Sequence, residues 1–142
     1  MSQYYEMEDQ TLWNPSNGSS QLFMRQMDVY RAELGLPCGI GPMQGDACQI
    51  DPVVFKEFVD ALLAWHRNTS HPVMAALSEG FVAAVLVLAE RAHIQVNWLL
   101  ADVAKDGSRT DVQVPAAQVV AEEAWASALR RTSHELGRFM AA

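Results

Sequence analysis

Residues 35–52, GLPCGIGPMQGDACQIDP, separate two stretches of helical periodicity, and the rest of the chain is arranged around them. The segment holds Cys38 and Cys48, the only cysteines of the protein, and four of its eight glycines. A structureless connection longer than about 12 to 15 residues is uncommon inside a compact domain and is usually functional or disordered. Its apolar members are Leu36, Ile40, Met43 and Ile50. A segment this apolar is not expected to be solvated, so it is the first candidate for a working surface.

Helical signals flank the segment on both sides. Residues 16–34 begin with serines able to cap a helix, carry an apolar face at helical spacing, and end before Gly35, a residue suited to terminate a helix. Residues 51–67 begin with Asp-Pro, an acid at the N-cap followed by proline in the first turn, and carry a broad apolar face. A third helix is predicted from Pro72 to about Arg91. Its middle is apolar all round, which is typical of a central, buried helix.

Beyond this helix the pattern changes from helical to alternating. Residues 93–98 alternate polar and apolar side chains, and residues 110–114 repeat the alternation more weakly after a turn at 105–108. The pattern predicts an antiparallel hairpin. Because an isolated hairpin is marginally stable, a third strand or a helix must lie against it, and residues 3–7 are the expected third strand. Residues 9–14 are interpreted as a lead into the first helix.

A last helix is predicted from Pro115 to about Met140, with acids early and arginines late, as the helix dipole favours. The predicted fold is therefore mainly helical α+β, with about four helices and a small antiparallel hairpin or three-stranded sheet. At 142 residues, the chain 1–142 is expected to form a single domain.

The formal net charge of -7 is unevenly distributed. Residues 1–60 carry nine acids and three bases, whereas residues 61–142 carry eight acids and seven bases. This balance argues against nucleic acid or an anionic membrane as the partner, because neither is attracted to an acidic surface. A basic protein would be attracted to such a surface. The N-terminus lacks the basic and apolar regions of a secretory signal, so a cytoplasmic location is expected.

The thiols and two of the four histidines are the candidate catalytic groups. Cys38 and Cys48 lie in a glycine-rich loop where local surroundings could activate a thiol, although buried, free, apolar cysteines are the preferred interpretation. His66 and His71 flank a predicted helix break and could converge if it is tight. Their spacing of five residues is not that of a zinc site on one helix, so no metal site is predicted.

Candidate binding residues gather near the acidic N-terminal half. Tyr4, Tyr5 and Trp13 could form an exposed aromatic rim, and Met43 and Asp46 lie in the loop. Asp46 is also a candidate acid–base group. The loop's glycines match neither the P-loop nor the dinucleotide-binding spacing, and no cofactor is predicted.

Three segments carry a family resemblance: WNPSN at 13–17, LPCGIGP at 36–42 and DACQIDP at 46–52. They resemble a small family of uncharacterised actinobacterial proteins of the streptomycete type. The resemblance covers roughly the first two thirds of the chain and implies a bacterial, cytoplasmic protein. It carries no activity and no catalytic residues.

These observations favour a non-catalytic protein-binding module whose acidic N-terminal half contacts another, basic protein, as an immunity or antitoxin-like protein would. Homodimer formation is left open. The alternative is a small enzyme or ligand-binding protein of secondary metabolism, with a pocket between the 35–52 loop and the central helix.

Overall fold

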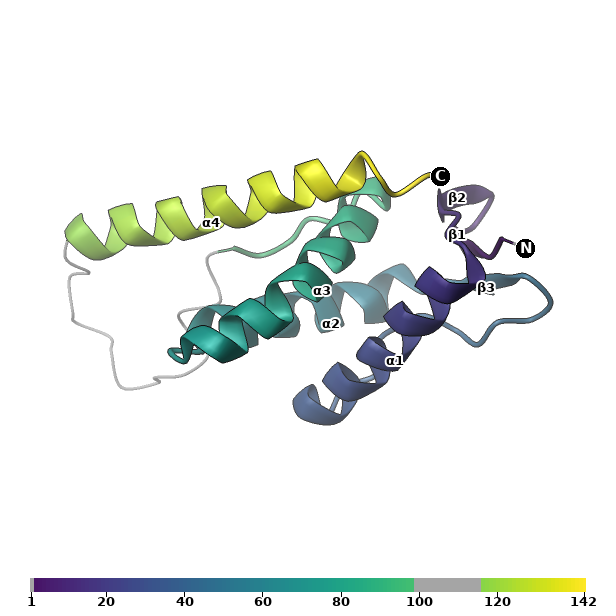
Figure 1. Cartoon of the computed structure of the whole chain (residues 1–142), viewed down its shortest axis with the longest axis horizontal. Coiled ribbons are helices and arrows are strands. Elements are labelled where there is room, and N and C mark those ends of the chain that lie inside the picture. Colours follow the sequence, from purple (N-terminus) through teal and green to yellow (C-terminus); the bar gives the residue numbers. More distant parts are fainter. Residues whose placement is uncertain (1, 99–115) are drawn as a thin grey trace.

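The computed structural model describes residues 2–98 and 116–142, and the side chains of the last helix from residue 124 onward. The helices within these ranges are α1 (Asn17–Leu34), α2 (Pro52–Asn68), α3 (Pro72–Arg91) and α4 (Ala116–Gly137). The strands are β1 (Tyr4–Met7), β2 (Gln10–Trp13) and β3 (Ala47–Gln49). Figure 1 shows the strands gathered at one end of the molecule, with α4 running above α3. The predicted mainly helical α+β fold is confirmed.

The sheet has the order β2-β1-β3 and mixes both strand directions. β1 and β2 form an antiparallel hairpin, whose tight turn places Glu8 at a φ of 54°. β3 lies parallel to β1, with Tyr4 opposite Ala47 and Glu6 opposite Gln49. The strand predicted at residues 3–7 is therefore present, while β2 and β3 arise in stretches that were predicted to be non-strand.

Residues 93–98 do not form the predicted strand. Their alternation has another cause: Ile94, Val96 and Trp98 are half-buried against the core. Side chains of α2 satisfy the backbone in place of a neighbouring strand. Lys56 Nζ donates to the Gln95 carbonyl at 2.9 Å, and the Asn97 amide donates to Asp60 at 2.9 Å. The other half of the predicted hairpin, residues 105–114, lies outside the described residues.

The predicted helix boundaries around the loop are confirmed. The Asp51 side chain accepts hydrogen bonds from the amides of Val53 and Val54, at 3.0 and 3.2 Å, and caps α2. Ser16 caps α1, and Gly35 ends it in the left-handed conformation at a φ of 65°. These caps satisfy amides and carbonyls that a helix end would otherwise leave unpaired.

α3 is the central helix, as predicted. Nearly all its side chains from Phe81 to Ala89 are buried, and it packs against α2, α4 and β2. α3 is long and apolar enough to cross a bilayer by composition alone, but 50% of that window is buried within the protein. Burial on this scale is typical of the core helix of a folded domain.

Hydrogen bonds hold α4 against α3. The buried Ser133 hydroxyl donates to the Ala83 carbonyl at 3.1 Å. The Arg91 guanidinium bridges two elements, since it donates to the carbonyls of Leu12 at 2.8 Å and Gly137 at 3.0 Å. α4 ends at Gly137, before the predicted end at Met140, and the Asn14 amide then holds the C-terminal tail by a 2.7 Å bond to the Ala141 carbonyl.

Candidate functional site

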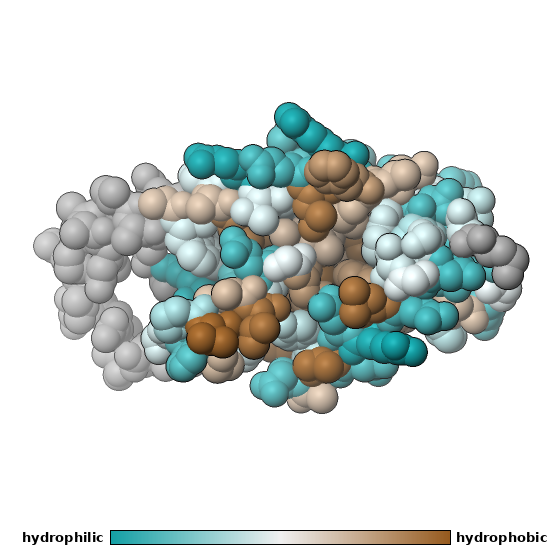
Figure 2. Space-filling view, viewed as in Figure 1, coloured by the Kyte–Doolittle hydropathy of each residue, from teal (hydrophilic) through white to brown (hydrophobic). Residues whose placement is uncertain are grey.

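The pairing of β3 with β1 joins two acidic segments that are far apart in sequence. The Tyr4 amide donates to the Asp46 carbonyl at 2.7 Å, and Gln49 Nε2 donates to the Glu6 carboxylate at 3.1 Å. We define the acidic end as the carboxylates carried by β1, the β1–β2 turn and the loop around β3: Glu6, Glu8, Asp9, Asp46 and Asp51. All except the half-buried Glu6 are exposed. Figure 2 shows neutral to hydrophilic residues covering this end of the molecule.

Two of the predicted binding residues are buried, so their interpretation as an exposed rim is wrong. Tyr5 is 0% exposed and Trp13 is 8% exposed. The Tyr5 hydroxyl lies 2.8 Å from the Ser20 hydroxyl, and burial raises the pKa of Tyr5 to about 12. The alternation of β1 and β2 turns these rings toward α1, where both pack against Phe23.

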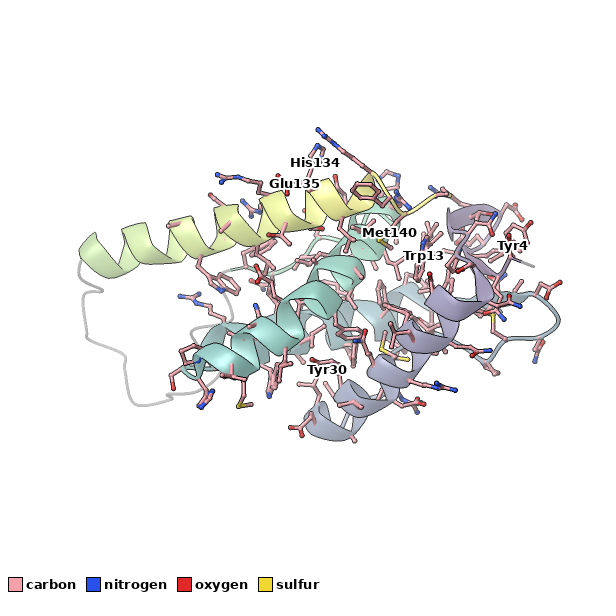
Figure 3. All side chains as sticks on the ribbon, in the orientation of Figure 1. Tyr4, Trp13, Tyr30, His134, Glu135 and Met140 are labelled. Carbon is pink, nitrogen blue, oxygen red and sulfur yellow. The ribbon has the colours of Figure 1, made fainter. Side chains whose placement is uncertain are left out.

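Tyr4, Met43 and Asp46 remain available at the surface. Tyr4 is 39% exposed, Met43 is half-buried and Asp46 is exposed. Figure 3 shows Tyr4 at the outer margin of the sheet, with Trp13 further in toward the helices. Gln44 and Ala47 exchange backbone hydrogen bonds, so Met43 and Asp46 lie at a tight turn just before β3. Of the predicted binding residues, Met43 and Asp46 in the loop therefore remain candidates. Tyr4 is the member of the predicted rim that stays at the surface.

The two cysteines are buried and free, as preferred from the sequence. Burial raises the pKa of Cys48 to about 12, with the nearby Glu6 and Cys38 adding to the shift. The Cys38 sulfur lies 3.4 Å from the Ile40 amide nitrogen, in a local turn. A thiol needs a lowered pKa and access to solvent to act as a nucleophile at neutral pH. Neither condition is met at Cys48.

The histidines are not brought to the loop. His66 is buried, its Nδ1 lies 2.8 Å from the Ser78 hydroxyl, and burial lowers its pKa. His71 is exposed at the start of α3. A helix rises ~1.5 Å per residue, so His66 lies ~20 Å along α2 from Pro52, the residue at which the loop ends. The described residues contain no group of three His, Cys, Asp or Glu side chains able to hold a metal ion.

The loop itself packs on the start of α2. The Asp51 amide donates to the Gly39 carbonyl at 2.7 Å. A Cβ added to Gly39 would lie 2.5 Å from the Phe55 amide nitrogen, and the φ of Gly39 is +77°. Only glycine fits both the conformation and the space. The predicted pocket against the central helix, with its cysteine, aspartate and histidine lining, is therefore not assembled from those residues.

A different pair of depressions lies on the far side of α3. The first, of about 480 Å³, lies between α3, residues 94–98 and α4, and the second, of about 600 Å³, adjoins it toward β2. They share Glu90, Ser133 and His134, and Arg130 and Arg138 lie at either end. We call the two together the α3–α4 groove. Sequence reasoning missed it, although Arg130, His134 and Arg138 recur every four residues and so share one helix face.

Exposed apolar side chains occur elsewhere. Val73, Met74 and Leu77 are 45 to 75% exposed on the first turns of α3, and Leu22 and Val29 are about 60% exposed on α1. Figure 2 shows apolar residues in several places on the face in view, between hydrophilic ones.

Comparison with known proteins identifies the family and no activity. No curated protein and no solved structure matches the chain. The sequence model of DUF6086, a family of unknown function, matches residues 1–142. Because the match covers the whole chain, the protein belongs to the DUF6086 family of unknown function.

Proposed function

We propose that the protein is a non-catalytic binding module that contacts a basic protein through its acidic end. The observation that carries the proposal is the parallel pairing of β3 with β1, which places Asp46 beside Tyr4 and Gln49 beside Glu6. Two acidic segments thereby share one surface. Residues 2–24 and 32–55, which supply it, contain no lysine or arginine.

Such a surface suits protein recognition on two counts. Concentrated like charge steers the encounter with an oppositely charged partner and disfavours anionic ones. Tyrosine and methionine are enriched at protein interfaces. Tyr4, whose amide donates to the Asp46 carbonyl, and Met43, in the same loop as Asp46, both reach the surface. The cysteines beneath this surface are buried, so the acidic end presents charge and shape without a nucleophile.

We propose that the protein acts in the cytoplasm of an actinobacterium as an immunity or antitoxin-like protein. Such proteins neutralise a partner by covering it and need no catalytic group. A homodimer formed through another face would be compatible with this role. An enzyme or ligand-binding protein built on the loop has less support, because its candidate groups are buried or lie apart.

The test compares partner capture by two charge-reversed proteins. The triple variant E8K/D9K/D46K reverses exposed carboxylates of the acidic end, and E79K reverses one exposed carboxylate on α3, far from the sheet. Each tagged protein is used for capture from extract of the source cells, at low and at high salt, followed by mass spectrometry. We expect a basic protein that is retained by the wild type and by E79K. It should be lost with the triple variant, and lost from the wild type in 0.5 M salt, where the screening length falls to ~4 Å.

A partner that survives both charge reversal and high salt would contradict the acidic-end proposal. Retention of a small molecule without a protein would favour the ligand-binding alternative. Circular dichroism of both variants controls for folding.

A further inference from the structure

The α3–α4 groove gathers positive charge on one wall. Arg130, His134 and Arg138 follow each other at four-residue spacing on α4, so their side chains lie on the same helix face. The Cα atoms of the two arginines are ~12 Å apart at 1.5 Å of rise per residue. All three side chains are exposed and line the groove. Two arginines along a groove, with a histidine between them, are arranged to meet a ligand with more than one acidic group.

Among the side chains that the structure describes, those of residues 2–98 and 124–142, no carboxylate forms an ion pair with Arg130 or Arg138. The ion pairs found there are Arg31–Asp28 and Lys56–Asp60. The neighbouring Arg91 differs, because its guanidinium is engaged by the carbonyls of Leu12 and Gly137. Arg130 and Arg138 thus keep N–H donors for a ligand, whereas Arg91 has a structural role.

Arg130 is also held in position. Its guanidinium carbon lies 4.4 Å from the centre of the Trp98 ring, at the mouth of the first depression. A cation–π contact restrains the guanidinium without using its hydrogen-bond donors, so less side-chain entropy is lost when an oxyanion binds. Trp98 itself is half-buried. The pair forms a pre-positioned anion contact beside an aromatic surface.

Glu90 lies opposite these α4 side chains, where the two depressions meet. Its carboxylate disfavours negative charge at the centre of the groove, while Arg130 and Arg138 favour it at the two ends. The volumes of about 480 and 600 Å³ are those of sites for small organic molecules. The groove therefore selects for acidic groups that are separated from each other.

We propose that the α3–α4 groove binds a small organic anion whose carboxylate or phosphate groups are separated, one near Arg130 and Trp98 and another near Arg138. His134 lies between them as a further hydrogen-bond donor or acceptor. This site is distinct from the acidic end and goes beyond partner binding.

The experiment titrates the full-length protein with two organic probes whose acidic groups are separated, fructose 1,6-bisphosphate and suberate, followed by calorimetry and by NMR of the arginine Nε–Hε groups. One probe tests phosphate and the other carboxylate, and saturable binding of either supports the groove and identifies the class. Hydrogen bonds to charged groups contribute about 1.5 to 3 kcal/mol, so R130Q and R138Q should each weaken binding about tenfold or more. E90Q should strengthen binding several-fold, because it removes a repelling charge.

The matched control is R131Q, which removes the same charge from an exposed residue of α4 that does not line the groove. Its affinity should stay within about twofold of the wild type, since residue 131 lies on a different face of α4 from the groove residues and its exposed charge is screened. Failure of both probes to bind would overturn the proposal. So would an R131Q effect equal to that of R130Q, or weaker binding by E90Q.

Discussion

The sheet at the acidic end and the α3–α4 groove differ in how far their candidate functional side chains are exposed to solvent. Around the sheet, Cys48 and Tyr5 are enclosed and both have a pKa raised to about 12 by burial. In the groove, Arg130 and Arg138 are exposed and keep free donors. The 35–52 loop, whose cysteines and Asp46 were candidate catalytic groups, is a structural connection that supports a charged surface. The candidate binding groups for a small ligand lie on α4, which was predicted as a helix without a function, and beside residues 94–98, which were predicted as a strand.

Thiol labelling tests the largest expected difference between the two regions. A thiol with a pKa of about 12 is ~10⁻⁴ ionised at pH 8, against roughly a quarter for a free cysteine of pKa ~8.5. Cys48 should therefore react with a disulfide reagent about a thousandfold more slowly than a free thiol. A cysteine placed beside the groove by Arg131→Cys should label at the free rate, as should all thiols in denaturing urea. Fast labelling of Cys48 in the native protein would reopen its role as a nucleophile.

Substitution of Gly39 tests whether the loop is structurally fixed. The left-handed conformation costs a non-glycine residue about 1 to 2 kcal/mol, and crowding against α2 adds about 1 to 3 kcal/mol. Gly39→Ala should therefore lower the free energy of unfolding by about 2 to 5 kcal/mol in urea denaturation. Gly45→Ala is the matched control, because its φ is +65° with no atom within 4 Å of the added Cβ. Equal effects of the two substitutions would show that the loop does not press on α2.

The Tyr5–Ser20 pair tests how tightly the sheet is joined to α1. Tyr5→Phe leaves the buried Ser20 hydroxyl without its partner, which should cost about 1 to 3 kcal/mol of unfolding free energy. The double variant Y5F/S20A removes both polar groups and should recover part of this loss. In contrast, Arg130→Gln on the groove surface should change stability by no more than about 0.5 kcal/mol. A large effect of Arg130→Gln would mean that the groove residues are structural.

The smallest expected effect is a pH dependence that comes from His66, in the helical layer between the two regions. Burial lowers its folded-state pKa, so the unfolded chain binds the proton more readily. Stability should therefore be fully present above the unfolded pKa of about 6.5 and should fall as pH drops from there toward the folded pKa. His66→Gln should flatten this part of the stability profile measured by urea denaturation. An unchanged profile would contradict the assignment to His66.

The sequence by itself predicted the four helices and the helix ends on either side of the 35–52 loop. The Asp51-Pro52 start, the Gly35 stop and the all-round apolar middle of α3 are local signals, since capping and periodic burial depend on residues within one or two turns. The burial of the cysteines was also the preferred interpretation.

Strand pairing was decided by tertiary structure. Residues 47–49 became a strand because β1, more than 40 residues earlier, supplied an edge. Residues 93–98 did not form a strand, because the side chains of Lys56 and Asp60 on α2 hydrogen-bond to their backbone in place of a neighbouring strand. An alternating pattern records which side chains are half-buried and not what they pack against. For the same reason, only the folded chain joins Glu6 to Asp46 in one acidic end. Likewise, only the packing of α4 on α3 places Arg130, His134 and Arg138 along a groove.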